Sequence, residues 1–213
     1  MGDNAQTMGD RLNVLLAEAG LKPRLADIAG RFGEYCSLLV RWNARTNLTA
    51  VRDAEGILSR HFVESIACAQ ALPHGIGSLL DFGSGAGFPG IPIALCRPEI
   101  AVTLAESQGK KAAFLREAVR TLGLSAVVHS GRAETLATRF DCVALRAVDR
   151  MELAVQAALK LVRPGGLLVV MTSLTEFEAL KAAQRAGLSW SESRLLPGSR
   201  AGLVAMARVV AAE

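Results

Sequence analysis

Hydrophobic residues recur with helical spacing in the first third of the chain. Leucines three and four positions apart predict a short helix over residues 10–20. A longer amphipathic pattern predicts a second helix from Leu25 to Trp42. Asp53 is placed to cap a third helix, whose apolar face runs from Leu58 to Ala69. We therefore expect a helical N-terminal region over residues 1–75.

Beyond residue 75 the pattern changes to short apolar runs that alternate with helical segments. Such alternation predicts βαβ units and a parallel sheet buried on both faces. We therefore expect an α/β fold with a doubly wound, mostly parallel sheet over residues 76–213 and an N-terminal helical extension. The predicted strands are 78–82, 101–105, 126–129, 142–145 and 167–171, with strand-like runs at 191–196 and 203–210; the predicted helices are 91–96, 110–122, 132–137, 151–161 and one in the tail from residue 175.

Composition and charge narrow this picture only a little. The 213 residues are 51% hydrophobic and 21% charged, and no apolar run reaches the length of a membrane span, so we expect a cytoplasmic protein without a membrane segment. The net charge of +4 mildly favours a polyanionic partner but suits many ordinary enzymes. The cysteines lie far apart without a neighbouring histidine, so we expect reduced, buried thiols and no metal site: Cys36, Cys68, Cys96 and Cys142.

The candidate chemistry begins where the first predicted strand ends in Asp81 and enters a glycine-rich turn. This turn fits two ligands. Gly85, Gly87 and Gly90 satisfy the dinucleotide fingerprint, whose pyrophosphate would rest on the next helix N-terminus. The D-x-G-x-G-x-G reading, which includes Gly83, fits S-adenosylmethionine, with Asp81 orienting the ammonium group of the ligand or ordering the loop.

Two further acidic residues follow predicted strands and favour S-adenosylmethionine. Glu106 ends the second strand, where a carboxylate can accept both ribose hydroxyls of either cofactor. Ala133 and Glu134 follow the third strand, where an acidic side chain and backbone amides can bind the edge of an adenine. A hydride-transfer enzyme of this fold commonly needs a tyrosine and a lysine late in the domain, but the only tyrosine, Tyr35, lies in the N-terminal region.

The fourth strand end, which should face the methyl acceptor, carries Arg146. It lacks the Asn/Asp-Pro-Pro-aromatic tetrad of many amine methyltransferases, and no cysteine lies in a loop with an activating neighbour. A guanidinium is a poor general base, but its planar donors can meet a base edge, a phosphate or the cofactor carboxylate. Transfer to an atom with a free lone pair, such as guanine N7, suits this residue, which is our candidate catalytic group. The structural alternative is an ion pair with Asp149 or Glu152.

Four segments resemble the GidB (RsmG) family, guanine-N7 methyltransferases of bacterial 16S ribosomal RNA. The resemblance spans roughly residues 40–171 and rests on residues 42–49, 60–65, 81–92 and 145–147. It implies a Rossmann-like class I methyltransferase that uses S-adenosylmethionine and acts on 16S ribosomal RNA or the small ribosomal subunit. Together with Asp81, Gly85 and Glu106, the cofactor contacts that it implies are Gly83, Phe88, Ala133, Glu134 and Arg146, and the residues that it implies receive RNA are Asn47, Arg60 and His61.

Each of these three RNA candidates has a structural alternative. Asn47 can cap a turn, Arg60 can pair with Glu64, and His61 can be a satisfied core histidine. The chain departs from the family at Glu64, usually Asp, and at Thr172, where Lys is frequent.

Two other functions remain open at this point, namely methylation of a small molecule or protein and non-catalytic RNA binding as an assembly factor. The intact acidic strand ends argue against loss of catalysis. We expect the protein to be a monomer.

Overall fold

A single mixed sheet forms the centre of the computed structural model, which describes residues 2–21, 28–148, 150–183, 187–191 and 193–210. Its strands follow the order β3-β2-β1-β4-β5-β8-β6, and β7 pairs with β8. The first five strands are parallel, whereas β8 runs antiparallel to β5 and to β6. The strands are β1 (Ser78–Phe82), β2 (Ala101–Glu106), β3 (Val127–Ser130), β4 (Phe140–Arg146), β5 (Val162–Ser173), β6 (Leu188–Trp190), β7 (Arg194–Leu195) and β8 (Gly202–Val209).

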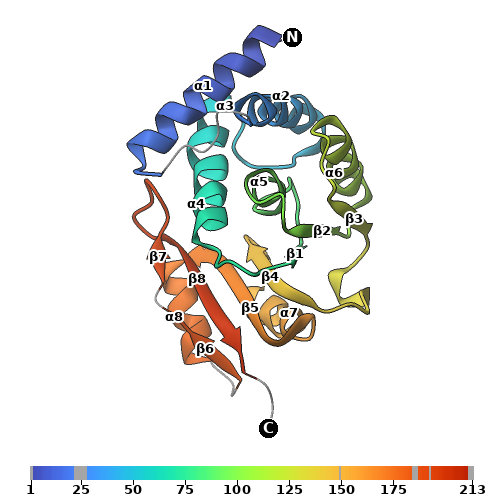
Figure 1. Cartoon of the computed structure of the whole chain (residues 1–213), viewed down its shortest axis with the longest axis vertical. Coiled ribbons are helices and arrows are strands. Elements are labelled where there is room, and N and C mark those ends of the chain that lie inside the picture. The colour runs from blue at the N-terminus through green and yellow to red at the C-terminus, as the bar shows by residue number, and fades with distance from the viewer. Residues whose placement is uncertain (1, 22–27, 149, 184–186, 192, 211–213) are drawn as a thin grey trace.

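The two faces of the sheet bury different residues of each strand. Leu79 belongs to one hydrophobic cluster and Leu80 to the other, and Ala144 and Leu145 of β4 divide in the same way. Because successive side chains of a strand point to opposite faces, this alternation requires helices on both sides. Figure 1 shows them, with α5 and α6 on one side of the sheet and α7 and α8 on the other. Their bounds are α5 (Gly90–Cys96), α6 (Gly109–Thr121), α7 (Met151–Leu159) and α8 (Leu174–Ala182).

The N-terminal helices extend the cluster on the α5 and α6 side. Tyr35 stacks on Phe62 with ring centroids 5.0 Å apart and lies 5.5 Å from Phe88. Its hydroxyl donates to the Ala86 carbonyl at 2.5 Å, so a fully buried tyrosine joins the helical region to the turn after β1. These helices are α1 (Gly2–Glu18), α2 (Ala29–Thr46), α3 (Ala54–Gly56), the π-helix η1 (Ile57–Phe62) and α4 (Val63–Ala71).

The expected fold class is confirmed, and a strand forms in each predicted run, although β5 begins at Val162 and, among the described residues of the run 191–196, only Arg194–Leu195 form a strand. Asp53 caps the third helix as expected, accepting from the Gly56 amide at 2.7 Å, but that helix passes through a π-helical stretch before α4. The predicted helix over 132–137 is wrong: only a 3₁₀ turn, η2 (Ala133–Thr135), forms there, because Leu136 is already extended on the way to β4. The short strand β6 was not predicted.

Other helix ends shift by a few residues. α1 begins well before residue 10, α7 ends at Leu159, and the predicted start of the second helix lies outside the described residues. The expected division between residues 75 and 76 stays a prediction. All four cysteines are free, and Cys96 is only partly buried where full burial was expected. Among the described residues, no helix has the length and apolar character needed to cross a membrane.

Candidate active site

A cavity of about 440 Å³ opens at the carboxyl ends of the parallel strands. Gly83, directly after β1, forms part of its wall together with Ala133 and Glu134 of η2. Arg150 and Leu153, at the start of α7, form another part. The strand order reverses at β1, because β2 and β3 lie on one side of it and β4 and β5 on the other. Ligands of doubly wound sheets bind at such a switch point. The cavity therefore lies at the expected ligand site of this fold.

Asp81 holds the glycine-rich turn from the end of β1. Its Oδ2 accepts from the Gly90 amide at 3.1 Å, and a Cβ on Gly90 would come within 2.6 Å of that oxygen. The close approach explains the glycine. Asp81 Oδ1 is buried and has no hydrogen-bond partner among the described residues, and burial raises the pKa of this carboxyl to about 7. A cationic donor such as an ammonium group would satisfy Oδ1 and favour the ionised form.

Glu106 ties the ends of β1 and β2 together. Its Oε2 accepts from the Gly85 amide at 2.9 Å, and its Oε1 accepts from the Gln108 amide at 2.7 Å. A carboxylate has about four acceptor positions, so each oxygen retains one for a further donor. The side chain is buried next to the cavity residues Ala105 and Ser107. It can therefore order the turn and still accept a pair of hydroxyl groups.

Glu134 supplies a negative charge to the wall of the cavity. Arg132 Nη2 donates to its Oε1 at 2.8 Å. Partial burial is the largest single effect and raises the pKa of Glu134, but the hydrogen bond from Arg132, a backbone hydrogen bond and the charge of Arg132 together leave the pKa below the ordinary value. The carboxylate therefore stays ionised at neutral pH, while Ala133 beside it is buried.

These features fit S-adenosylmethionine. The volume lies within the range of roughly 300–1,000 Å³ that is common for small-molecule sites. The unpartnered Asp81 Oδ1 suits the ammonium group, Glu106 suits the ribose, and Glu134 suits the amino edge of adenine. The dinucleotide alternative fits less well, because the Gly90 amide at the start of α5 is already bound by a carboxylate, which would repel a pyrophosphate.

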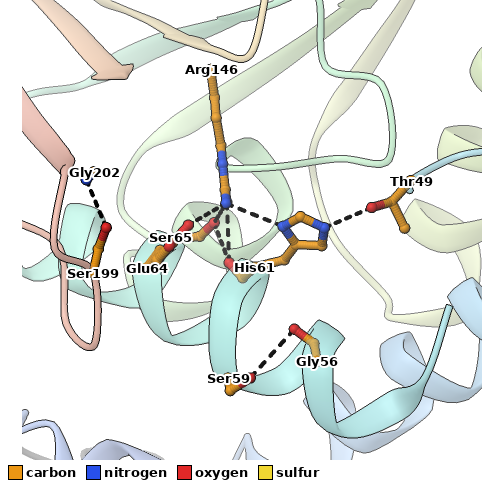
Figure 2. A network of polar contacts seen from close by, with 9 residues as sticks. All are labelled: Thr49, Gly56, Ser59, His61, Glu64, Ser65, Arg146, Ser199 and Gly202. Carbon is orange, nitrogen blue, oxygen red and sulfur yellow. Dashed lines mark hydrogen bonds and ion pairs between the residues drawn. The ribbon is translucent and has the colours of Figure 1, made fainter. Parts of the chain in front are cut away.

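Arg146, at the end of β4, is the centre of a polar network that reaches into the N-terminal helices (Figure 2). Its Nη1 donates to Ser65 Oγ at 3.0 Å and to the His61 carbonyl at 3.3 Å. Its Nη2 donates to His61 Nδ1 at 3.1 Å and forms an ion pair with Glu64. The side chains of Arg146 and Glu64 are each only 12% exposed. The guanidinium therefore joins β4 to η1 and α4 through a largely buried ion pair.

The network fixes the tautomer of His61. Arginine only donates, so His61 Nδ1 must accept and the proton must be on Nε2. Nε2 then donates to Thr49 Oγ1 at 2.6 Å. Burial and then the charges of Arg146 and Arg60 lower the pKa of His61 to about 3. His61 is therefore neutral, and its lone pair is occupied.

The apolar ring of Phe88 packs against this network. The His61 ring lies 5.0 Å from the Phe88 ring, and the Arg146 guanidinium carbon lies 5.8 Å from its centroid. A cation over an aromatic face is favourable, and more so when water is excluded. The π-helix η1 directs His61 into this network, and such irregular turns are frequent at functional sites.

The sequence matches the family described as GidB, rRNA small subunit methyltransferase G, over residues 29–195. This span includes the cavity, the acidic strand ends and the Arg146 network. The chain belongs to the GidB family. It is 44% identical over 191 residues to the ribosomal RNA small subunit methyltransferase G of Stenotrophomonas maltophilia K279a, which covers 88% of this chain and 86% of that protein.

A second relative agrees with this assignment, and a solved structure has a similar fold. The protein of the same name from Xanthomonas oryzae pv. oryzae is 42% identical over 170 residues, covering 78% of this chain and 79% of the relative. An O-methyltransferase from Bacillus cereus in complex with SAH has a similar structure, with a TM-score of 0.57 and 19% identity over 83% of this chain and 90% of that one. At this identity the likeness supports the fold alone.

The GidB chain distributes its predicted site residues over two neighbouring groups. Gly83, Ala133 and Glu134 line the cavity, whereas Asp81, Gly85 and Glu106 are not lining residues but neighbour them in the strand ends and the turn after β1. Phe88, His61 and Arg146 form the polar network instead. Arg146 pairs with Glu64 and not with the predicted Glu152, which accepts from Gln156. The predicted alternative with Asp149 lies outside the described residues. The functional roles of all these residues stay predictions.

Asn47 and Arg60 are both exposed to solvent. Asn47 ends α2 in a left-handed conformation, and its Oδ1 accepts from Arg52 Nη2 at 2.7 Å. The alternative in which Arg60 pairs with Glu64 is wrong, because Glu64 binds Arg146. Arg60 is exposed, yet its charge lowers the pKa of His61.

Three residues of the site were not singled out as site residues from the sequence. Asn43 is buried and holds the loop after α2, accepting from the Thr49 amide at 2.9 Å and donating to the Val51 carbonyl at 3.0 Å. Thr49 holds His61, and Ser65 holds Arg146. Asn43 and Thr49 belong to the segment 42–49 that carries part of the family resemblance, and its polar residues were the signal that could have identified them.

Proposed function

We propose that the chain transfers a methyl group from S-adenosylmethionine to N7 of a guanine in 16S ribosomal RNA. S-adenosylmethionine supplies a methyl group on a sulfonium centre. We infer that Asp81, Glu106 and Glu134 hold the cofactor in the cavity of about 440 Å³. We further infer that Arg146 and His61 orient the acceptor beside it, with Asn47 and Arg60 receiving RNA.

The observation that carries the proposal is that no described side chain of the polar network is a free general base. The His61 lone pair accepts from Arg146, and the pKa of His61 is lowered to about 3. Glu64 is bound to Arg146, and the guanidinium itself cannot take a proton. Methylation of an amine or hydroxyl must release a proton. Guanine N7 carries no hydrogen and attacks with a free lone pair, so no proton has to leave. Orientation of donor and acceptor is then the main contribution of the protein.

The setting of the reaction belongs to the same proposal. Ribosomal RNA is made in the bacterial cytoplasm, so we place the protein there and expect it to act as a monomer. Within the described residues, no group of three or more histidine, cysteine, aspartate or glutamate side chains is arranged to hold a metal ion. The proposed transfer requires none.

Transfer of radiolabelled methyl groups tests the proposal. The protein is incubated with labelled S-adenosylmethionine and, separately, naked 16S ribosomal RNA, small ribosomal subunits and large-subunit RNA. We expect label in 16S ribosomal RNA in at least one of the first two reactions and none in the third. Cofactor binding without labelling of either small-subunit substrate would contradict the proposed acceptor and leave the cofactor site standing.

A further inference from the structure

A separate cavity of about 520 Å³ lies between α2 and α6, outside the site described above. We call it the α2–α6 groove; its lining residues are Arg41, Trp42, Ala44, Arg45 and Thr46 of α2 and Glu117 of α6. Trp42 fixes the two helices at this point. Its Nε1 donates to Glu117 Oε2 at 3.2 Å, and its ring meets the edge of Phe114 at a centroid distance of 5.7 Å.

The groove carries two arginines that form no ion pair with any described residue. Arg41 and Arg45 are exposed, and neither side chain forms a hydrogen bond or an ion pair within the part of the chain that the structure describes. They are four residues apart on one helix, and therefore neighbours on one face, where like charges repel each other. The one acidic lining residue, Glu117, accepts a hydrogen bond from neutral Trp42 and keeps its charge, so the two arginines leave an excess of positive charge in the groove.

The helix dipole explains only part of this arrangement. Arg45 is in the last turn of α2, where a cation is favourable, but Arg41 is a turn earlier, where the effect has fallen away. An anion from another molecule would offset the repulsion between the two side chains. The charge pattern therefore favours an extended anionic partner over a neutral one.

The loop that follows α2 links the groove to the proposed acceptor site. Arg31 Nε donates to the Leu122 carbonyl at the end of α6, whereas Trp42 contacts the middle of α6, so α2 runs antiparallel to α6 toward the carboxyl edge of the sheet. Three residues beyond α2, Thr49 binds His61 of the Arg146 network. Exposed Lys110 begins α6 at the same edge.

We propose that the α2–α6 groove binds the phosphate backbone of the RNA strand that flanks the methylated nucleotide, with Arg41 and Arg45 each contacting a phosphate. This inference rests on the proposed RNA substrate. A strand whose base enters the acceptor site must leave it over an adjoining surface, and the groove is an adjoining surface with unpaired cations. An acidic segment of a ribosomal protein is the competing partner, but nothing requires such a segment to continue into the acceptor site.

The salt dependence of RNA binding tests the groove. The slope of log K against log salt concentration is negative, and each lost phosphate contact on single-stranded RNA lowers its magnitude by about 0.7. The R41Q/R45Q double variant should therefore lose about 1.4 from this slope on naked 16S ribosomal RNA. The matched control is R139Q/K160Q, because Arg139 and Lys160 are exposed, form no side-chain hydrogen bond or ion pair with the described residues, and precede β4 and β5 at the opposite edge of the sheet. The control should keep the wild-type slope.

The outcomes separate this inference from the proposed function. If the wild-type protein methylates 16S ribosomal RNA and R41Q/R45Q retains its slope, the groove proposal is overturned while the function stands. An equal loss in the control would show a general charge effect and also overturn it. Weaker binding to small subunits with unchanged binding to naked RNA would assign the groove to a ribosomal protein instead. Should the double variant fail to fold, R41Q alone should lose about 0.7, and an unchanged slope there has the same meaning.

Discussion

Replacing Arg146 by methionine would leave Glu64 buried without its cation. The two side chains are each 12% exposed, and the guanidinium also donates to Ser65 and His61. Removing one partner of a buried ion pair costs about 3–5 kcal/mol. For a protein of this size each kcal/mol shifts Tm by about 2–4 °C, so Arg146→Met should lower Tm by roughly 6–20 °C. Thermal and urea unfolding at about pH 8 measure the change.

A second substitution tests the cause. Adding Glu64→Leu removes the stranded charge, so the double variant should recover most of the lost stability, as buried pairs replaced by apolar residues often do. Burial raises the pKa of Glu64 even in the wild type, with Arg146 opposing the rise. Without Arg146 that pKa rises further, so the folded state binds the proton more tightly than the unfolded chain. The stability defect of Arg146→Met should therefore shrink as pH falls through this raised pKa.

The double variant also separates a structural role of Arg146 from a role in methyl transfer. If the Arg146→Met, Glu64→Leu protein is stable and cannot transfer methyl groups, Arg146 also acts on the reaction, as we propose. A stable and active double variant would limit Arg146 to joining β4 with α4. A loss below about 1 kcal/mol in the single variant, or no recovery in the double, would refute the buried-pair argument itself.

Three further predictions concern the cofactor site. Glu106→Gln should weaken S-adenosylmethionine binding by about tenfold or more in calorimetry, since a carboxylate acceptor is lost, while Tm changes by only a few degrees; unchanged affinity would remove Glu106 from the site. Because the pKa of Asp81 is raised to about 7 and the ammonium group requires the ionised form, affinity should rise as pH increases through about 7. Asp81→Asn should abolish that rise, and a retained pH dependence would contradict this role. Gly90→Ala should cost about 1–3 kcal/mol in urea unfolding, because its Cβ would meet Asp81 and Leu104, and an unaltered midpoint would show that the turn can shift.

The fold could be predicted because each strand buries a short apolar run and each helix an amphipathic face. Those are local properties, and the strands β1 to β5 follow them. The turn at η2 could not be predicted in this way, because residues 132–137 have helical spacing but must return to β4 within a few residues. The π-helix η1 is set by packing of Phe62 against Tyr35 and Phe88, a long-range effect without a local pattern.

The same distinction between local patterns and long-range contacts applies to the candidate site. Asp81, Glu106 and Glu134 could be located because parallel strand ends meet at one edge of a sheet. The partner of Arg146 could not, since Glu64 is distant in sequence and the nearby acidic residues were the obvious candidates. The neutral state of His61 likewise depends on burial and on two arginines that only the folded chain brings together.

Chemical mapping of the methylated base tests the central claim most directly. Small-subunit RNA treated with the protein and S-adenosylmethionine is reduced with borohydride and cleaved with aniline, which breaks the chain at N7-methylguanine. We predict cleavage at a single guanine, dependent on cofactor and strongly reduced with Glu106→Gln. RNA that incorporates label but does not cleave would place the methyl group on another atom, and the argument from the missing general base would be wrong.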